Sequence, residues 1–377
     1  MTWFAITFSA LLSVLLGALL YAMPAITHPT LPLGVSVPQA RVADPVIVAS
    51  VRRYRRWILM SLVLGLVLSA VLGFAAPTVG IIVPVLLVSV LGMGSYVVSR
   101  EAIARTKREG GWYEDVPVRL AANVTAARVS APIPFGWYLA ATVLLAIAAG
   151  IGVAVYPALP DPLPIHWDLN GVANGFAQKS VWSAFGVVLV GLGVVALLFA
   201  LSFLVRVARP RRMASDSPAL ATRRAEVQQH LLGGLLGQIT LITSALLAGL
   251  TIAGWLAPTS GFLPIVSIVL FLGLLALAIA AYFVGYRRAM VPRTEASGSA
   301  APQHPTATAV DAPDDDHYWK GGLVYVNRRD PALLVPKRFG VGWTINLGHP
   351  AGVAIGVVIL LIIAGSITLA IVTGSRR

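Results

Sequence analysis

Eight apolar stretches, each long enough to span a lipid bilayer as a helix, constrain the fold of this chain more than any other feature. A helix needs roughly 20 apolar residues to cross a bilayer core of about 30 Å. The stretches lie at 4–26, 57–76, 79–98, 136–156, 182–205, 231–256, 262–285 and 351–373. Only 11% of the residues are charged, compared with about 25% in a typical soluble domain. The sequence therefore predicts an all-α integral membrane protein with about eight transmembrane helices.

The basic residues are distributed unevenly between the two predicted sides of the membrane. Of 28 Lys and Arg residues, 25 follow the first, third, fifth or seventh stretch, and only Lys179, Arg376 and Arg377 fall on the other side. Lys and Arg are retained on the cytoplasmic side of a membrane. We therefore predict both termini outside and residues 286–350 in the cytoplasm. The net charge of +13 then reflects insertion and attraction to anionic headgroups, without direct nucleic-acid binding.

The alternation of apolar and polar segments divides the chain into six predicted parts. These are an N-terminal three-helix membrane region at 1–135, a helix–loop–helix module at 136–205, a helical hairpin region at 206–293, a disordered linker at 294–313, a small β-rich domain at 314–350, and a last transmembrane helix and tail at 351–377. The linker is rich in Ala, Ser, Pro and Thr, which bury too little apolar surface to fold. Short alternating runs between turn signals predict a cytoplasmic β-meander in 314–350.

The predicted external loop, Leu159 to Ser180, has the pattern of an ordered loop. Prolines stiffen its start, and two Asn-Gly pairs favour turns. Side chains alternate along an extended chain, so every second residue from His166 onward falls on one face. The candidate ligand-recognition residues are His166, Trp167, Asp168, Asn170, Gly171, Asn174 and Lys179. Two interpretations remain open, a structural loop clipped by His166 or a surface that recognises an external ligand.

Residues suited to catalysis or metal binding are scarce. The chain has no cysteine, and His166 is the single histidine predicted outside. Zinc requires three or four protein ligands, and calcium fits the loop no better. The apolar stretches contain no charged residue, and Gln238 is their only amide. We predict no catalytic residue, metal or cofactor, and we expect Ser180 to serve as the N-cap of the following helix.

The 314–350 segment combines aromatic and basic side chains. Its candidate cytoplasmic interface residues are Trp319, Lys320, Lys337, Arg338 and Trp343. Aromatic and basic residues alternate in sites for single-stranded nucleic acid. Next to a bilayer, however, Trp and Tyr together with Lys and Arg favour interfacial anchors. We predict anchors, and whether this segment contacts protein or lipid stays open.

Two segments resemble known families. The first segment has Leu-Pro, then Pro-x-His-Trp-Asp, a Gly, and a Lys-Ser before a helix. This pattern resembles the small bacterial membrane domain of unknown function found in SdpI-type immunity proteins. The matching residues are Leu159, Pro160, Pro164, His166, Trp167, Asp168, Gly171, Lys179 and Ser180. Where that family usually has Pro-Asp, this chain has Ala173-Asn174, which removes a carboxylate. The runs WKGG at 319–322, DPALLVPKR at 330–338 and GWTIN at 342–346 resemble a second uncharacterised domain that accompanies the first.

The resemblance implies a bacterial cytoplasmic membrane protein with the proline-rich loop outside. The best-understood member of the SdpI family protects its producer against a secreted toxin and captures a repressor at the membrane. We therefore expect a non-enzymatic sensor, immunity or regulatory protein whose partners are the lipid bilayer, an external peptide or envelope ligand and a cytoplasmic regulator. The alternative is a transporter or flippase without ionisable coupling residues, whose cavity would reach Gln238. The sequence leaves the oligomeric state open.

Overall fold

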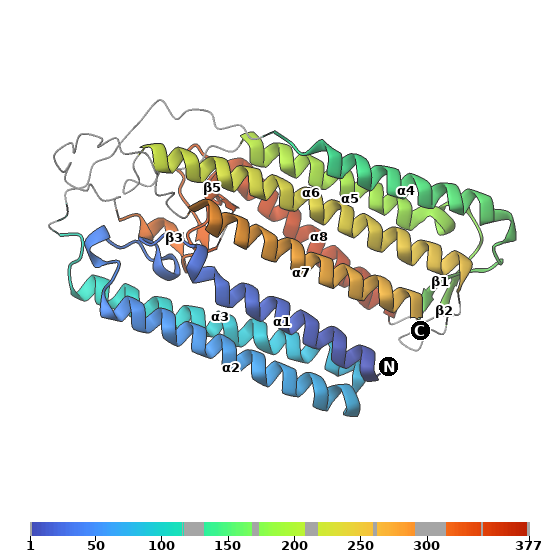
Figure 1. Cartoon of the computed structure of the whole chain (residues 1–377), viewed down its shortest axis with the longest axis horizontal. Coiled ribbons are helices and arrows are strands. Elements are labelled where there is room, and N and C mark those ends of the chain that lie inside the picture. Colours follow the sequence, from blue (N-terminus) through green and yellow to red (C-terminus); the bar gives the residue numbers. More distant parts are fainter. Residues whose placement is uncertain are drawn as a thin grey trace, which may run out of the picture.

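Long helices dominate the computed structural model, which describes residues 2–114, 116, 132–167, 173–207, 218–258, 262–290, 314–340 and 342–374 (Figure 1). The helices are α1 (Thr2–Ile26), α2 (Pro45–Ala75), α3 (Pro77–Glu109), α4 (Phe135–Val155), α5 (Val181–Val207), α6 (Pro218–Leu256), α7 (Phe262–Met290) and α8 (Pro350–Gly374). By length and composition, seven helices, α1 to α7, suffice to cross a membrane, and α8 is a further apolar helix of 25 residues. This confirms the predicted all-α membrane-protein fold.

Several helices extend beyond the apolar stretches that predicted them. Helix α2 begins at Pro45, because the Asp44 carboxylate accepts the backbone N–H of Val46 at 3.0 Å and proline suits the first helical position. The four arginines between residues 52 and 56 are therefore helical. Helix α2 ends at Ala75, and Pro77 starts α3 after a single connecting residue. A search for apolar stretches finds only the part of such a helix that is apolar enough to lie in the bilayer.

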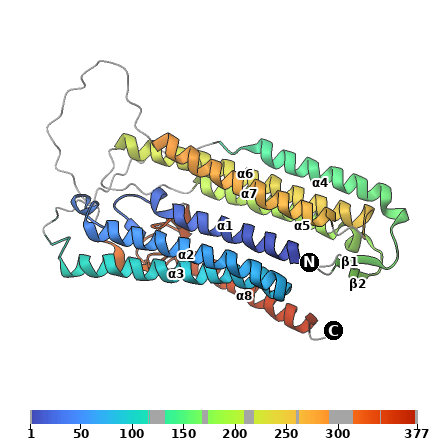
Figure 2. The ribbon, with the colours of Figure 1, turned by 60° about the horizontal axis from the view of Figure 1, so that its bottom comes forward.

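The helices pack in two groups, α1 to α3 and α4 to α7 (Figure 2). Tyr54 and Ile103 lie in the core of the first group, and Leu145 and Val188 lie in the core of the second. The backbones of α2 and α3 approach closely near their connection, since a Cβ atom on Gly80 would lie 2.8 Å from the backbone of α2. Many large apolar side chains on the outer helix faces are exposed. Apolar surface of this extent is typical of a protein that contacts lipid.

The polar segments lie at opposite ends of the helices (Figure 1). At one end, which we call the hairpin end, are the start of α1, the end of α8 and the hairpin of β1 (Leu163–Trp167) and β2 (Ala173–Ala177). At the other, the basic end, are the 27–44 segment and the 314–350 block. The 27–44 segment contains two short 3₁₀ turns, η1 (Pro32–Gly34) and η2 (Gln39–Arg41). These two ends hold the candidate sites.

The 314–350 block consists of two hairpins. It begins with a 3₁₀ turn, η4 (Asp316–Tyr318), followed by β3 (Trp319–Lys320), β4 (Val324–Tyr325), β5 (Leu334–Pro336) and β6 (Trp343–Ile345). The predicted meander is interrupted, because β3 pairs with β4 and β5 with β6 in separate antiparallel sheets. A single parallel bridge between Tyr325 and Asn346 joins them.

The side chain of Asn346 connects the two hairpins. Asn346 is fully buried, and its amide nitrogen donates to the carbonyls of Asn327, Asp330 and Ala332. Its amide oxygen accepts the backbone N–H groups of Asn327 and Gly348. One side chain thereby satisfies backbone groups that a continuous sheet would otherwise pair. The block is consequently a small ordered unit despite its short strands.

Candidate functional site

The hairpin end brings together two of the predicted recognition residues, His166 and Asn174. Strand β1 places His166 opposite Gly175 of β2, and the Nδ1 atom of His166 lies 2.5 Å from Oδ1 of Asn174. Glycine is needed at 175, because a Cβ atom there would lie 2.7 Å from the Cβ of His166. The predicted residues Asp168, Asn170 and Gly171 lie outside the described residues.

Trp167 attaches the hairpin to α6. Its indole Nε1 donates to the carbonyl oxygen of Pro258, just beyond the end of α6, at 2.6 Å. The indole ring lies over Gly254, where a Cβ atom would be 3.2 Å from the ring. Pro258 is 91 residues from Trp167, so local sequence patterns gave no signal for this contact.

Lys179 closes the base of the loop. Its ammonium group donates to the carbonyls of Pro157 at 3.1 Å and Leu159 at 2.9 Å and lies 5.2 Å from the centre of the Tyr156 ring. The adjacent Ser180 accepts the backbone N–H of Ser183 at 3.1 Å, which confirms the predicted N-cap of α5. The contacts of Lys179 hold the loop together, and its role in ligand recognition stays a prediction.

Two apolar side chains that sequence reasoning did not single out are exposed on the same hairpin. Ile165 is 51% and Phe176 is 56% exposed, and His166 is also exposed. Their signal in the sequence was the presence of large apolar residues beside polar turn residues. The hairpin therefore combines a fixed backbone with exposed apolar, imidazole and amide groups, a combination that suits binding of a partly apolar ligand.

At the basic end, Asp316 lies at the centre of an ionic cluster formed by three distant segments. Its carboxylate accepts from the Lys107 ammonium group at 2.6 Å, from the Ser36 backbone N–H at 3.0 Å, and from the Arg338 guanidinium group. Asp315 pairs with the same guanidinium group. The side chains of Lys107 and Arg338 are only 6% and 4% exposed. The cluster thus joins the block to the end of α3 and to the 27–44 segment.

Opposing effects determine the pKa of Asp316. Burial would raise the pKa, but Arg338 and Lys107 outweigh burial and hold the pKa of this carboxyl below its usual value. Since the folded-state pKa is lowered, this carboxylate stabilises the docked block fully above the unfolded-state pKa of about 3.9. That contribution is lost as the pH falls through the lower, folded-state pKa.

We therefore expect the block to remain docked between pH 7 and about pH 4.5 and to loosen at lower pH. The chain has no cysteine, so nitroxide labels can be attached uniquely at Arg105→Cys on α3 and Lys320→Cys in the block, both exposed positions. Pulsed electron paramagnetic resonance would then report the distance between the labels as a function of pH. A broadened distance distribution already at pH 6 would contradict the role of Asp316.

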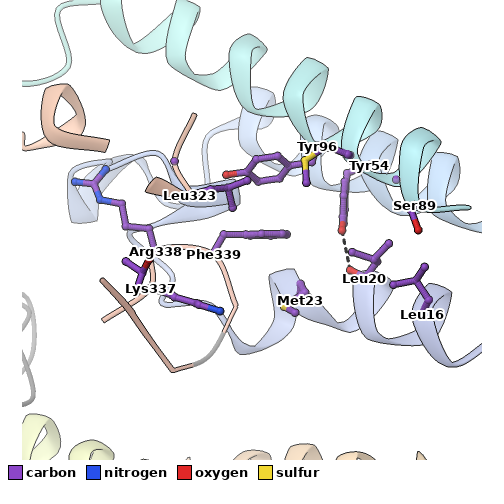
Figure 3. A pocket seen from close by; sticks show the side chains of 14 residues that line it. Leu16, Leu20, Met23, Tyr54, Ser89, Tyr96, Leu323, Lys337, Arg338 and Phe339 are labelled. Carbon is purple, nitrogen blue, oxygen red and sulfur yellow. Dashed lines mark hydrogen bonds between the residues drawn. The ribbon is translucent and has the colours of Figure 1, made fainter. Parts of the chain in front are cut away.

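An aromatic contact adds to the ionic cluster. Phe339 of the block inserts between Tyr96 of α3 and Tyr54 of α2, with ring centres 4.6 and 6.0 Å away (Figure 3). The Tyr96 hydroxyl also donates to the carbonyl of Gly321 at 3.1 Å. The 27–44 segment supports this contact through buried apolar residues, of which Leu33 is fully buried. The block is therefore docked on α1 to α3 by both ionic and apolar contacts.

The predicted anchor residues of the block fall into two groups. Trp319 is buried in the core of the block against Tyr325, and the Arg338 guanidinium group lies 5.1 Å from its ring centre. Both Trp319 and Arg338 are buried and complete the packing of the block itself, and their predicted role in a cytoplasmic interface stays a prediction. Lys320 and Lys337 are exposed, and Trp343 is partly buried in β6.

A comparison with sequence families matches two short parts of the chain. Residues 143–192 match a domain of unknown function, DUF1648, and residues 328–353 match a family of unknown function, DUF5808. The first match spans most of α4, the β1–β2 hairpin and the start of α5, and the second spans β5, β6 and the start of α8. No curated protein and no solved structure matches the chain. The helices define a multi-pass membrane protein, and two short parts of it are similar to families of unknown function.

Proposed function

We propose that this chain is a non-enzymatic sensor, immunity or regulatory protein of the SdpI type in a bacterial cytoplasmic membrane. The hairpin end faces outward and the basic end faces the cytoplasm. The distribution of Lys and Arg supports this orientation, because 25 of 28 lie in segments on the proposed cytoplasmic side. In this proposal, the β1–β2 hairpin recognises an external peptide or envelope ligand and the basic end engages a cytoplasmic regulator.

The observation that carries the proposal is that the hairpin is fixed in place while its binding groups remain exposed. The Trp167 indole attaches the hairpin to the end of α6, and Ile165, His166 and Phe176 remain accessible. A preorganised surface loses less entropy on binding than a mobile loop. Apolar side chains beside an imidazole and an amide suit a peptide with both apolar and polar groups.

Helix α6 offers a physical connection between the two ends. It is 39 residues long, and its outer end lies against Trp167 of the hairpin. It packs against α4, α5 and α7. Ligand contact at the hairpin would therefore act on a helix that extends to the basic end. A sensor needs a structural element with two arrangements that bind the ligand with different affinities.

The proposal predicts that Phe176→Ser reduces recognition without unfolding the protein, because Phe176 is already 56% exposed. A photoreactive amino acid at 176 should crosslink to a discrete external species, and His166→Ala should weaken that crosslink about tenfold, the effect of losing a typical hydrogen bond at a binding surface. The matched control is a photoreactive residue at Trp182, which is 76% exposed at the start of α5.

The functional readout is the sensitivity of cells carrying the chain to culture medium from the organism that encodes it. Cells with the wild-type chain should survive better than cells without it, or should change expression of a reporter gene. Phe176→Ser should abolish this effect. The proposal fails when position 176 gives the same crosslinks as position 182 and neither survival nor reporter expression depends on Phe176.

A further inference from the structure

A pocket lies where the block meets the membrane helices, away from the hairpin and next to the ionic cluster, whose Arg338 forms part of its lining (Figure 3). Its volume is about 480 Å³, within the range of sites that bind small molecules. Leu16 and Leu20 of α1 and Met93 of α3 form its apolar part. These three residues lie within the apolar stretches 4–26 and 79–98 that predict membrane-spanning helices. The pocket therefore begins at a depth where lipid chains surround the helices.

The opposite wall of the pocket is aromatic and basic. Phe339 points into the pocket between Tyr54 and Tyr96, and the Lys337 side chain extends its amine toward α1 (Figure 3). Along the length of the pocket, the lining side chains are thus first aliphatic, then aromatic and finally cationic. A molecule that matches this order has a hydrocarbon chain at one end and an anionic group at the other.

Lys337 and Arg338 differ in their availability to such a group. The Arg338 guanidinium group is occupied by Asp315 and Asp316. Lys337 is exposed and, among the residues that the structure describes, forms no ion pair. Lys337 is therefore the cation at the pocket that remains available to an external anion.

We propose that this pocket binds one anionic glycerophospholipid, with an acyl chain along Leu16, Leu20 and Met93 and the phosphate beside Lys337. Basic pockets between transmembrane helices on the cytoplasmic side commonly hold anionic lipid headgroups. A single lipid would contact α1, α3 and the block together, and so would favour the docked arrangement by binding it in preference to the undocked one. This site acts independently of ligand recognition at the hairpin.

The test compares lipids retained by the purified full-length chain, measured by native mass spectrometry after exchange into mixed micelles of phosphatidylglycerol and phosphatidylcholine. We expect the wild-type chain to retain phosphatidylglycerol in preference. Lys337→Ala should reduce this preference about fivefold, the effect of one basic residue near an anionic headgroup. The matched control, Lys320→Ala, removes an exposed lysine of the same block that does not line the pocket and should leave the preference unchanged.

A second variant addresses the apolar part of the pocket. Ser89 of α3 lines the pocket, and Ser89→Phe should fill it and reduce retention of both lipids. Millimolar inorganic phosphate should not displace the lipid, because the hydrocarbon chain provides most of the binding. Equal retention of the two lipids by the wild-type chain would overturn the proposal. So would equal preference in Lys337→Ala and Lys320→Ala, or displacement by phosphate alone.

Discussion

Replacing Asp316 with alanine is expected to release the 314–350 block from α1 to α3. The substitution leaves Lys107 and Arg338, each less than a tenth exposed, without the carboxylate that they share. A buried charge left without any partner costs about 3 to 5 kcal/mol, and the cost here is smaller, because Lys107 keeps Asp314 and Arg338 keeps Asp315. The Ser36 backbone N–H also loses its acceptor. The apolar contact of Phe339 and the partly exposed Lys107–Asp314 pair then have to hold the block without the shared carboxylate.

The nitroxide pair at Arg105→Cys and Lys320→Cys measures this release directly. The wild-type chain should give one narrow distance distribution, and Asp316→Ala should give a broad one. Asp314→Ala is the matched control, because Asp314 also pairs with Lys107, at 2.7 Å, but is 38% exposed. Screening by solvent limits the contribution of such a pair to about 1 kcal/mol or less. Identical narrow distributions in Asp316→Ala and wild type would show that the cluster does not hold the block.

Replacing Trp167 with alanine is expected to free the β1–β2 hairpin from α6. The variant loses the hydrogen bond to the Pro258 carbonyl, worth about 1 kcal/mol. It also loses the packing of the indole over Gly254, and substitutions of a large aromatic residue by alanine cost about 3 kcal/mol or more in well-packed sites. Trp167→Phe retains part of the packing and should have an intermediate effect. If the hairpin is the recognition surface, ligand binding should weaken in the same order.

The corresponding measurement uses labels at Gln178→Cys, just after β2, and Phe262→Cys, at the start of α7, both exposed positions. Trp167→Ala should broaden the distance distribution between them. Trp182→Ala is the control, because this tryptophan is 76% exposed and has no comparable role in attaching the hairpin. A narrow distribution in Trp167→Ala would mean that the hairpin holds its position through β1–β2 pairing and the Lys179 contacts alone.

The apolar stretches predicted the helices, because membrane insertion imposes a length and composition that a single sequence displays directly. Ser180 was predictable as an N-cap for a similar reason, since capping depends on residues only a few positions apart. The Pro45 start of α2 lay outside the apolar window. The Asp44 cap and a charged first section define that part of the helix.

The contacts that form the two candidate sites could not be predicted from local patterns. Asp316 bonds to Ser36 and Lys107, which are 280 and 209 residues away, and nothing near Asp316 distinguishes it from its acidic neighbours. The sequence of the block shows its mixture of aromatic and basic residues, but this mixture is compatible both with an exposed membrane anchor and with a packed core. Only the fold shows that Trp319 and Arg338 are used internally while Lys337 remains available.

We propose that the hairpin and the 314–350 block lie on opposite sides of the membrane. Single-cysteine variants test it most directly, since the chain has no cysteine of its own. Phe176→Cys and Lys320→Cys would be treated with a membrane-impermeant maleimide in right-side-out vesicles, before and after permeabilisation. We predict that position 176 is labelled in sealed vesicles and position 320 only after the vesicles are opened. Labelling of both positions in sealed vesicles would show that they lie on the same side, and labelling of position 320 alone would show the opposite orientation; either result would rule out the proposed topology.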